Sequence, residues 1–255
     1  MILAIDVGNT NIVIGCCEEN NIKFVERLST NPSNTVLEYV ISFKTVLELY
    51  NIDPLSIEGG IISSVVPSVV TAIKSAVKKL TGKDFMVIGP GLKTGLSICI
   101  DNPAQLGSDL VVDAVAGINE YDLPLVIFDM GTATTVSVID ENKNYLGGMI
   151  IPGVSVSLNS LISRTSQLPK ISLDPPKRII GKNTIECMKS GILYSAASSI
   201  DGIIERIEED LGKKVCAIAT GGLAGIIIPY CNHNVILDDE LLLKGLLLIY
   251  NKNKK

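Results

Sequence analysis

Two short segments of this chain carry the residue types that can hold a phosphate group. The first is Asp6-Val7-Gly8-Asn9-Thr10-Asn11 and the second is Asp129-Met130-Gly131-Thr132. In each, an apolar run ends in aspartate, turns through glycine and small polar residues, and continues into a second apolar run. Such a hairpin presents backbone N–H groups, hydroxyls and a carboxylate, which can bind phosphates and Mg²⁺. For either copy alone, an ordinary glycine turn is the alternative interpretation.

The two segments lie nearly half the chain apart, which indicates an internal duplication. Two similar domains that each offer a phosphate loop to a shared cleft are similar to the actin-like ATPase and sugar kinase superfamily. A chain of 255 residues is long enough for two domains of ordinary size. We therefore expect an α/β fold of two ribonuclease-H-like domains with a nucleotide cleft between them.

The hydrophobic pattern predicts the same order of elements in each half, a strand meander followed by helices and strands. In the first half we expect strands at 1–5, 12–17, 22–28, 60–66 and 85–88, and helices at 35–50, 67–82 and 105–119. In the second half we expect strands at 125–129, 134–140, 145–151 and 215–219, and helices from 155, at 184–211 and at 239–250. Tyr121 to Pro124 interrupts the predicted helices and strands and indicates a domain boundary. The predicted domains are therefore 1–120 and 121–255.

Further motifs, taken in order, make the chain resemble the type III pantothenate kinases over essentially its full length. They are Asp101-Asn102-Pro103, Gly107-Ser108-Asp109, Gly147-Gly148, Pro152-Gly153, Gly181-Lys182-Asn183-Thr184 and Thr220-Gly221-Gly222-Leu223-Ala224. Each motif is weak alone, whereas their order and spacing together are specific. The resemblance implies ATP-dependent phosphorylation of pantothenate to 4′-phosphopantothenate, the first step of coenzyme A biosynthesis.

The resemblance also implies where ATP and its cations bind. Asp6 holds Mg²⁺ through water, and Asp129 supports a monovalent cation, K⁺ or NH₄⁺. The residues implied to contact the nucleotide are Val7, Gly8, Asn9, Thr10, Asn11, Gly131, Thr132, Gly221 and Gly222. From the residues alone, Asp129 can instead cap its own turn, and Gly221 can serve a simple left-handed turn.

Asp109 matches the family's catalytic carboxylate. Phosphoryl transfer needs one carboxylate to orient and accept the proton of the substrate hydroxyl. The same aspartate also favours a helix start by opposing the helix dipole, and both roles are compatible. The resemblance implies that the substrate contacts are Ile100, Gly107, Ser108, Asp109, Leu110 and, from a partner subunit, Thr184. A homodimer is therefore expected.

The chain departs from the family pattern at two substrate positions. Family members usually have arginine directly after the catalytic aspartate and tyrosine before Asp-x-Pro, where this chain has Leu110 and Ile100. Leucine offers no hydrogen-bond donor to the carboxylate of pantothenate. Two alternatives stay open: a diverged small-molecule kinase with another substrate, and a catalytically weak nucleotide-binding regulator.

Composition excludes several other classes of function. The net charge of −5 is spread along the chain, which disfavours a nucleic-acid partner. The six cysteines show no metal-ligand spacing, and His233 is the single histidine, so a general base is sought among the carboxylates. Apolar runs stay below about 18 residues and Asp6 interrupts the first of them. We therefore expect no membrane partner and a cytoplasmic location.

Overall fold

The structure is a computed structural model that describes residues 1–19 and 21–254. It divides the chain into two compact units. The first comprises Met1–Gly95, Asn102–Ala116 and the segment from Leu241 onward, and the second comprises Leu96–Asp101 and Gly117–Glu240. This grouping differs from a single division after residue 120, because the C-terminal helix belongs to the first unit and a short segment before residue 102 belongs to the second.

Within the described residues, the first unit is built on a five-stranded sheet of order β3-β2-β1-β4-β5. The first three strands form the expected antiparallel meander, and the last two continue the sheet in parallel. The strands are β1 (Ile2–Val7), β2 (Asn11–Glu18), β3 (Asn21–Ser29), β4 (Gly59–Ser64) and β5 (Met86–Val87). The helices associated with this unit are α1 (Val36–Leu49), η1 (Pro54–Ser56), α2 (Pro67–Thr81), η2 (Pro103–Gln105), α3 (Ser108–Glu120) and α7 (Leu241–Asn253).

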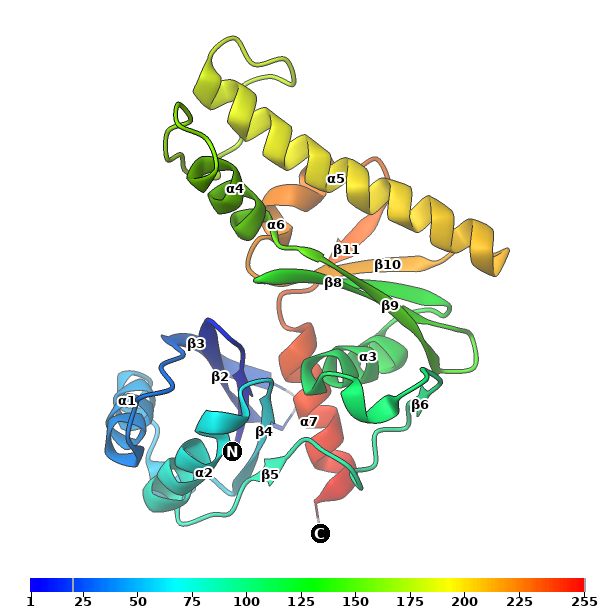
Figure 1. Cartoon of the computed structure of the whole chain (residues 1–255). Helices are drawn as coiled ribbons and strands as arrows, with labels where there is room; N and C mark the ends of the chain where they lie inside the picture. Colours follow the sequence, from blue (N-terminus) through cyan, green and yellow to red (C-terminus); the bar gives the residue numbers. More distant parts are fainter. Residues whose placement is uncertain (20, 255) are drawn as a thin grey trace. The chain divides into compact units, whose positions relative to one another are not determined.

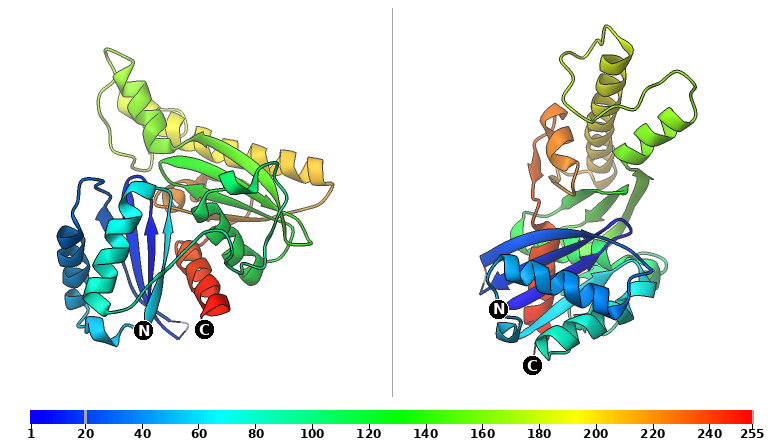
Figure 2. Two further views of the ribbon diagram at one scale, coloured as in Figure 1. Left: turned by 60° about the horizontal axis from the view of Figure 1, so that its bottom comes forward. Right: turned by 90° about the vertical axis from the view of Figure 1, so that its left-hand side faces the viewer.

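Helices cover both faces of this first sheet, α1 and α2 on one side and α7 on the other (Figures 1 and 2). Side chains alternate along a strand, so Leu3, Ile5 and Val7 pack into the core that contains α1 and α2. Neighbouring residues point the opposite way. A Cβ atom added to Gly15 of β2 would lie 2.8 Å from Leu243 of α7. Asp6, which alternates with Ile5 and Val7, therefore projects from the α7 side of the sheet.

Local sequence signals set the ends of these helices. Thr35 and Glu38 form a capping box at the start of α1, in which the Thr35 N–H donates to Glu38 Oε2 at 2.6 Å. Pro67 begins α2, and Gly82, with φ of +72°, ends it. The helix expected from 105 begins only at Ser108, because Asn102 caps a separate short helix at Pro103–Gln105.

Within the described residues, the second unit is built on a six-stranded sheet of order β11-β10-β7-β8-β9-β6. The strands are β6 (Ser97–Ile98), β7 (Leu125–Met130), β8 (Ala133–Ile139), β9 (Asn144–Pro152), β10 (Cys216–Thr220) and β11 (Val235–Leu237). Its helices are α4 (Val154–Ser163), α5 (Thr184–Leu211), α6 (Ala224–Ile227) and η3 (Ile228–Tyr230). The long α5, yellow in Figure 1, runs across one face of this sheet, where Leu193, Ala197 and Ile200 pack against Phe128 and Val136.

The order β9-β8-β7-β10-β11 repeats the order β3-β2-β1-β4-β5, with the same antiparallel and parallel pairings. This repetition agrees with the internal duplication expected from the two loops. Strand β6 is an addition to the repeat, because it pairs in parallel with β9 at the edge of the second sheet.

His233 makes a structural contact. Its Nδ1 atom lies 3.1 Å from Asp201 Oδ1, and the backbone N–H groups of Asn232 and His233 donate to the same carboxylate. Burial opposes ionisation of Asp201, but these donors outweigh it and lower the pKa of the carboxyl group. The contact ties the loop before β11 to the middle of α5, which supports the expectation that His233 is not a catalytic base.

All six cysteines are free thiols. Among the helices of the described residues, none combines the length and apolar composition needed to cross a membrane.

Candidate active site

The loop that connects β1 to β2, the first of the two predicted phosphate loops, has a defined shape. The N–H of Gly8 donates to the carbonyl of Asn11 at 2.9 Å and closes the turn. Thr30, just beyond β3, donates its hydroxyl to the Gly8 carbonyl at 2.7 Å and its N–H to the Thr10 carbonyl at 2.9 Å. Thr30 thus stabilises the backbone of the loop, while Asn9 and Thr10 are exposed at its tip.

Sequence reasoning missed Thr30. Because Asn11 pairs with Ser29, the chain just after β3 lies beside the first loop. Thr30 therefore contacts this loop although it is distant in sequence. A threonine directly after the third strand of the predicted meander was the only signal available. Its two hydrogen bonds stabilise the turn that the Gly8 N–H and the Asn11 carbonyl close.

The second predicted phosphate loop, between β7 and β8, is built in a similar way. The Gly131 N–H donates to the Ala133 carbonyl at 3.1 Å, and the Gly153 N–H donates to the Thr132 carbonyl at 3.2 Å. A Cβ atom on Gly153 would collide with the backbone of this loop, so glycine is needed there. Gly131 and Thr132 are exposed.

Asp129 and Gly221 are neighbours in the second unit. Strands β7 and β10 pair in parallel with Asp129 opposite Thr220, which places Gly221 at the carboxyl end of the next strand. Gly221 has φ of +92°, and a Cβ atom there would lie 2.7 Å from Asp129 Oδ1. The expected adenosine loop and the expected cation carboxylate therefore meet at one end of the second sheet, where ligands of parallel sheets commonly bind.

Asp109 lies half-buried in the first turn of α3. Burial raises the pKa of its carboxyl group, and the N–H of Leu110, which donates to Asp109 Oδ1 at 2.9 Å, opposes that rise. A Cβ atom on Gly107 would collide with the same carboxylate oxygen, so Gly107 leaves space for it. A carboxylate with a raised pKa is suited to accepting a proton.

The other predicted substrate residues are distributed over both units. The hydroxyl of Ser108 lies against the end of β4, 3.0 Å from the Ser64 carbonyl oxygen to which it donates. Leu110 follows in the first unit, half-buried. Ile100 belongs to the second unit, where its Cγ2 atom lies 3.9 Å from the position of a Cβ on Gly147. Thr184 is exposed at the start of α5, after the N-cap residue Asn183.

Each unit therefore assembles its own share of the predicted residues. The first brings Asp6, Gly8, Asn9, Thr10, Gly107, Ser108, Asp109 and Leu110 to the carboxyl ends of β1 and β4 and the start of α3. The second brings Asp129, Gly131, Thr132, Gly221 and Gly222 to the carboxyl ends of β7 and β10.

Comparison with known proteins decides the family. The family model described as type III pantothenate kinase matches residues 2–206. A curated relative, the type III pantothenate kinase of Exiguobacterium sp., is 44% identical over 255 residues, which is 100% of this chain and 100% of the relative. This chain belongs to the type III pantothenate kinase family. The expected enzyme class, a phosphotransferase, is confirmed by this membership.

Solved structures confirm the fold expected for a type III pantothenate kinase. Component A of (R)-2-hydroxyglutaryl-CoA dehydratase from Acidaminococcus fermentans is 14% identical, with a TM-score of 0.55 and coverage of 98% of this chain and 96% of that chain. A protein described as a 2-dehydro-3-deoxygalactonokinase from Sinorhizobium meliloti is 10% identical, with a TM-score of 0.62 and the same coverage. At these identities the likeness shows the fold alone, which is the α/β fold of actin-like ATPases and sugar kinases.

The residues of this family member fit a magnesium nucleotide. Asp6, 9% exposed at the end of β1, supplies a carboxylate near the first loop, as Mg²⁺ prefers. Mg²⁺ in kinases is commonly held by one or two carboxylates together with water and substrate phosphates, so a dedicated cage is not required. Among the described residues there is also no cluster of three His, Cys, Asp or Glu residues suited to a metal.

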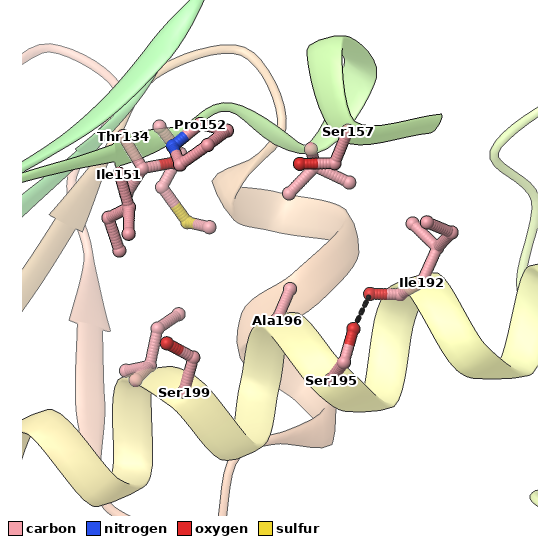
Figure 3. Close-up of a pocket in the computed structure, with 11 residues that line it drawn as sticks. Thr134, Ile151, Pro152, Ser157, Ile192, Ser195, Ala196 and Ser199 are labelled. Carbon is pink, nitrogen blue, oxygen red and sulfur yellow. Dashed lines mark hydrogen bonds between the residues drawn. The ribbon is translucent and has the colours of Figure 1, made fainter. Parts of the chain in front are cut away.

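A cavity of about 220 Å³ lies behind the second loop of this pantothenate kinase (Figure 3). In Figure 3, Thr134, Ile151 and Pro152 lie on one side of it, and Ser195, Ala196 and Ser199 of α5 lie on the other. The other lining residues are Met130, Val154, Ser157, Ile192 and Ile200. These apolar and hydroxyl side chains do not suit a triphosphate.

Proposed function

We propose that this chain transfers the γ-phosphate of ATP to the terminal hydroxyl of pantothenate and releases ADP and 4′-phosphopantothenate, the first step of coenzyme A biosynthesis. Family membership supports the reaction. The half-buried Asp109, with its raised pKa at the start of α3, is the observation that supports the mechanism. We also propose that the enzyme acts in the cytoplasm, where ATP is available.

In the proposed mechanism Asp109 orients the pantothenate hydroxyl and accepts its proton. The hydroxyl oxygen forms a bond to the γ-phosphorus as the bond between that phosphorus and the β,γ-bridging oxygen breaks. Little covalent work is left to the protein, so positioning and charge neutralisation provide most of the rate enhancement. The close contact of Asp109 with Gly107 and the hydrogen bond from the Leu110 N–H support such positioning.

The two loops bind the phosphates in this proposal. Asp6 would hold Mg²⁺ through water, and Val7 to Asn11 would contact the phosphates. Gly131 and Thr132 would also contact the phosphates, and Gly221 and Gly222 would border the adenosine. Mg²⁺ when bound neutralises charge on the phosphate oxygens. A monovalent cation at Asp129, K⁺ or NH₄⁺, adds to that neutralisation.

We propose that the active enzyme is a homodimer, with Thr184 reaching the substrate of its partner. An apolar tip just before α5 supports this: Ile179 and Ile180 are 63% and 77% exposed. The tip is nonetheless anchored, because the Ser190 hydroxyl donates to the Ile179 carbonyl and the Lys177 N–H donates to Glu186 Oε2 at 3.0 Å. A fixed, exposed apolar tip is typical of a protein interface.

The dimer is tested by Ile180→Asp, which places a charge on this tip. Burying an isoleucine stabilises an interface by about 1.5–3 kcal/mol and a symmetric dimer buries two copies, so we expect dimerisation to weaken by at least about 10²-fold. Light scattering at assay concentration measures the mass, and the pantothenate KM should rise with dissociation. Leu55→Asp, at a residue 76% exposed in the first unit, is the matched control. A fully active Ile180→Asp monomer would refute the dimer.

The identity of the substrate is tested by Leu110→Arg, which supplies the guanidinium that this chain lacks. A charge-assisted hydrogen bond contributes about 1.5–3 kcal/mol, so the pantothenate KM should fall by about one to two orders of magnitude, while the ATP KM stays almost unchanged. Ile100→Tyr should add a smaller gain. Leu110→Met, similar in volume and without a donor, is the control.

Two other outcomes of this experiment would each identify a different pocket. If Leu110→Arg leaves the pantothenate KM unchanged, another cation already binds the carboxylate, and exposed Arg164, Arg178 and Lys182 in the second unit are the candidates. If Leu110→Arg instead destroys an activity on some other alcohol, the pocket serves a different substrate, and the diverged-kinase alternative replaces pantothenate phosphorylation.

A further inference from the structure

Ser63 lies at the carboxyl end of β4 and is completely buried, with 0% exposure. In the parallel pairing of β1 with β4, Ser63 is directly opposite Asp6. The preceding pair, Ile5 and Ile62, points into the core beneath α1 and α2. Because side chains alternate along a strand, Asp6 and Ser63 project side by side from the opposite face of the sheet.

Ser63 contacts the helix that carries Asp109. Its Oγ atom lies 3.1 Å from the Oγ atom of Ser108, the first residue of α3. The Ser108 hydroxyl also donates to the Ser64 carbonyl at 3.0 Å and accepts from the Ser64 N–H at 3.2 Å. A hydroxyl has one proton, and Ser108 uses it on the Ser64 carbonyl. Ser63 must therefore be the donor in its bond to Ser108.

We propose that Ser63 is a positioning residue for phosphoryl transfer: it docks the first turn of α3 onto the end of β4 and so sets the place of Asp109 relative to Asp6. The inference rests on the proposed roles of Asp6 and Asp109. All four residues belong to the first unit, so this spacing is built within a single compact body. The distance between Asp109 and Asp6 is thereby set without any contribution from the second unit.

The physical need for such a contact follows from the reaction. A misplacement of about 1 Å can reduce the rate by about 10²-fold when reacting groups must be aligned. Asp6 is fixed by the sheet, whereas Asp109 lies at the start of a helix that begins directly after the short loop at Leu106 and Gly107. The Ser63 and Ser108 hydroxyls join these two elements across 45 residues of sequence.

The experiment compares steady-state kinetics of Ser63→Ala, Ser63→Thr, Ser108→Ala and the double variant Ser63→Ala/Ser108→Ala in the full-length enzyme. We expect Ser63→Ala to lower kcat about tenfold with an unchanged ATP KM, because it loosens Asp109 and leaves the nucleotide loops alone. Ser63→Thr, which keeps a hydroxyl on Cβ, should restore most of kcat. Thr81→Val is the control, since the Thr81 hydroxyl is also buried in the first unit and bonds the Val77 carbonyl at 2.8 Å.

The double variant tests whether Ser63 acts through Ser108. If it does, the double variant is no slower than Ser108→Ala alone, because the second substitution removes a contact already lost. Multiplicative losses would overturn the inference. So would a Ser63→Ala enzyme with normal kcat, or one that differs from wild type only in thermal stability, as Thr81→Val is expected to do.

Kinetics of Asp109→Asn beside Ser63→Ala separate a missing positioning role of Ser63 from a missing base role of Asp109. An inactive Asp109→Asn variant beside a normal Ser63→Ala enzyme refutes the positioning role and leaves the base in place. A fully active Asp109→Asn variant refutes the base itself, and Ser63 loses its proposed purpose with it.

Discussion

Asp109→Asn should lower kcat by about 10²-fold or more while ATP binding stays nearly normal, because the variant loses the proton acceptor and keeps the volume of the side chain. Asp109 already sits where Gly107 leaves it space and the Leu110 N–H holds one carboxylate oxygen. The measurements are steady-state kinetics with pantothenate and nucleotide binding by calorimetry. Asp84→Asn, at an exposed carboxylate of the first unit paired with Lys78, is the matched control.

The raised pKa of Asp109 also predicts how the reaction rate depends on pH. The wild-type rate should fall on the acid side as Asp109 takes up a proton, at a pH above the ordinary aspartate range. A carboxyl group whose pKa is raised by folding contributes stability below its unfolded pKa and loses it as the pH rises through the folded value. The Asn variant does not ionise, so near neutral pH it should be as stable as the wild type or more stable. Near-normal turnover in Asp109→Asn would exclude this residue as the base.

Activity should require K⁺ or NH₄⁺, and Asp129→Ala should remove that dependence together with most of the activity. A cation at Asp129 offsets phosphate charge in the transition state, an effect on the order of several kcal/mol, so a loss of about 10²-fold is expected. Asp129 is half-buried at the end of β7, beside the backbone of Gly221. Rates are compared in K⁺, NH₄⁺ and Na⁺ salts at equal ionic strength.

Two controls accompany the cation experiment. Thermal unfolding of Asp129→Ala shows whether the loop between β7 and β8 is still folded, and Asp84→Asn should keep the wild-type response to each salt. Equal wild-type rates in Na⁺ and K⁺ buffers would defeat the proposed cation site, whatever the variant does.

Features that depend on neighbouring residues could be predicted from the sequence. The Asp-x-Gly turns after Val7 and Met130 and the glycine end of α2 are local signals, and the structure has each at the expected place. The repeated strand order follows from the repeated hydrophobic pattern. Together with the family comparisons, these signals were sufficient for the fold class and the enzyme class.

Features that depend on contacts between distant segments could not be predicted from the sequence and are seen in the fold. Helix α7 packs on β1 and β4 of the first unit, and β6 joins the edge of the second sheet, although their positions in sequence suggest the reverse. Thr30 contacts the first loop and Ser63 contacts Ser108, and no local motif predicts either contact. Their roles arise because strand register and helix packing bring a hydroxyl to within hydrogen-bond distance of a particular backbone or side chain, and neither composition nor spacing encodes that distance.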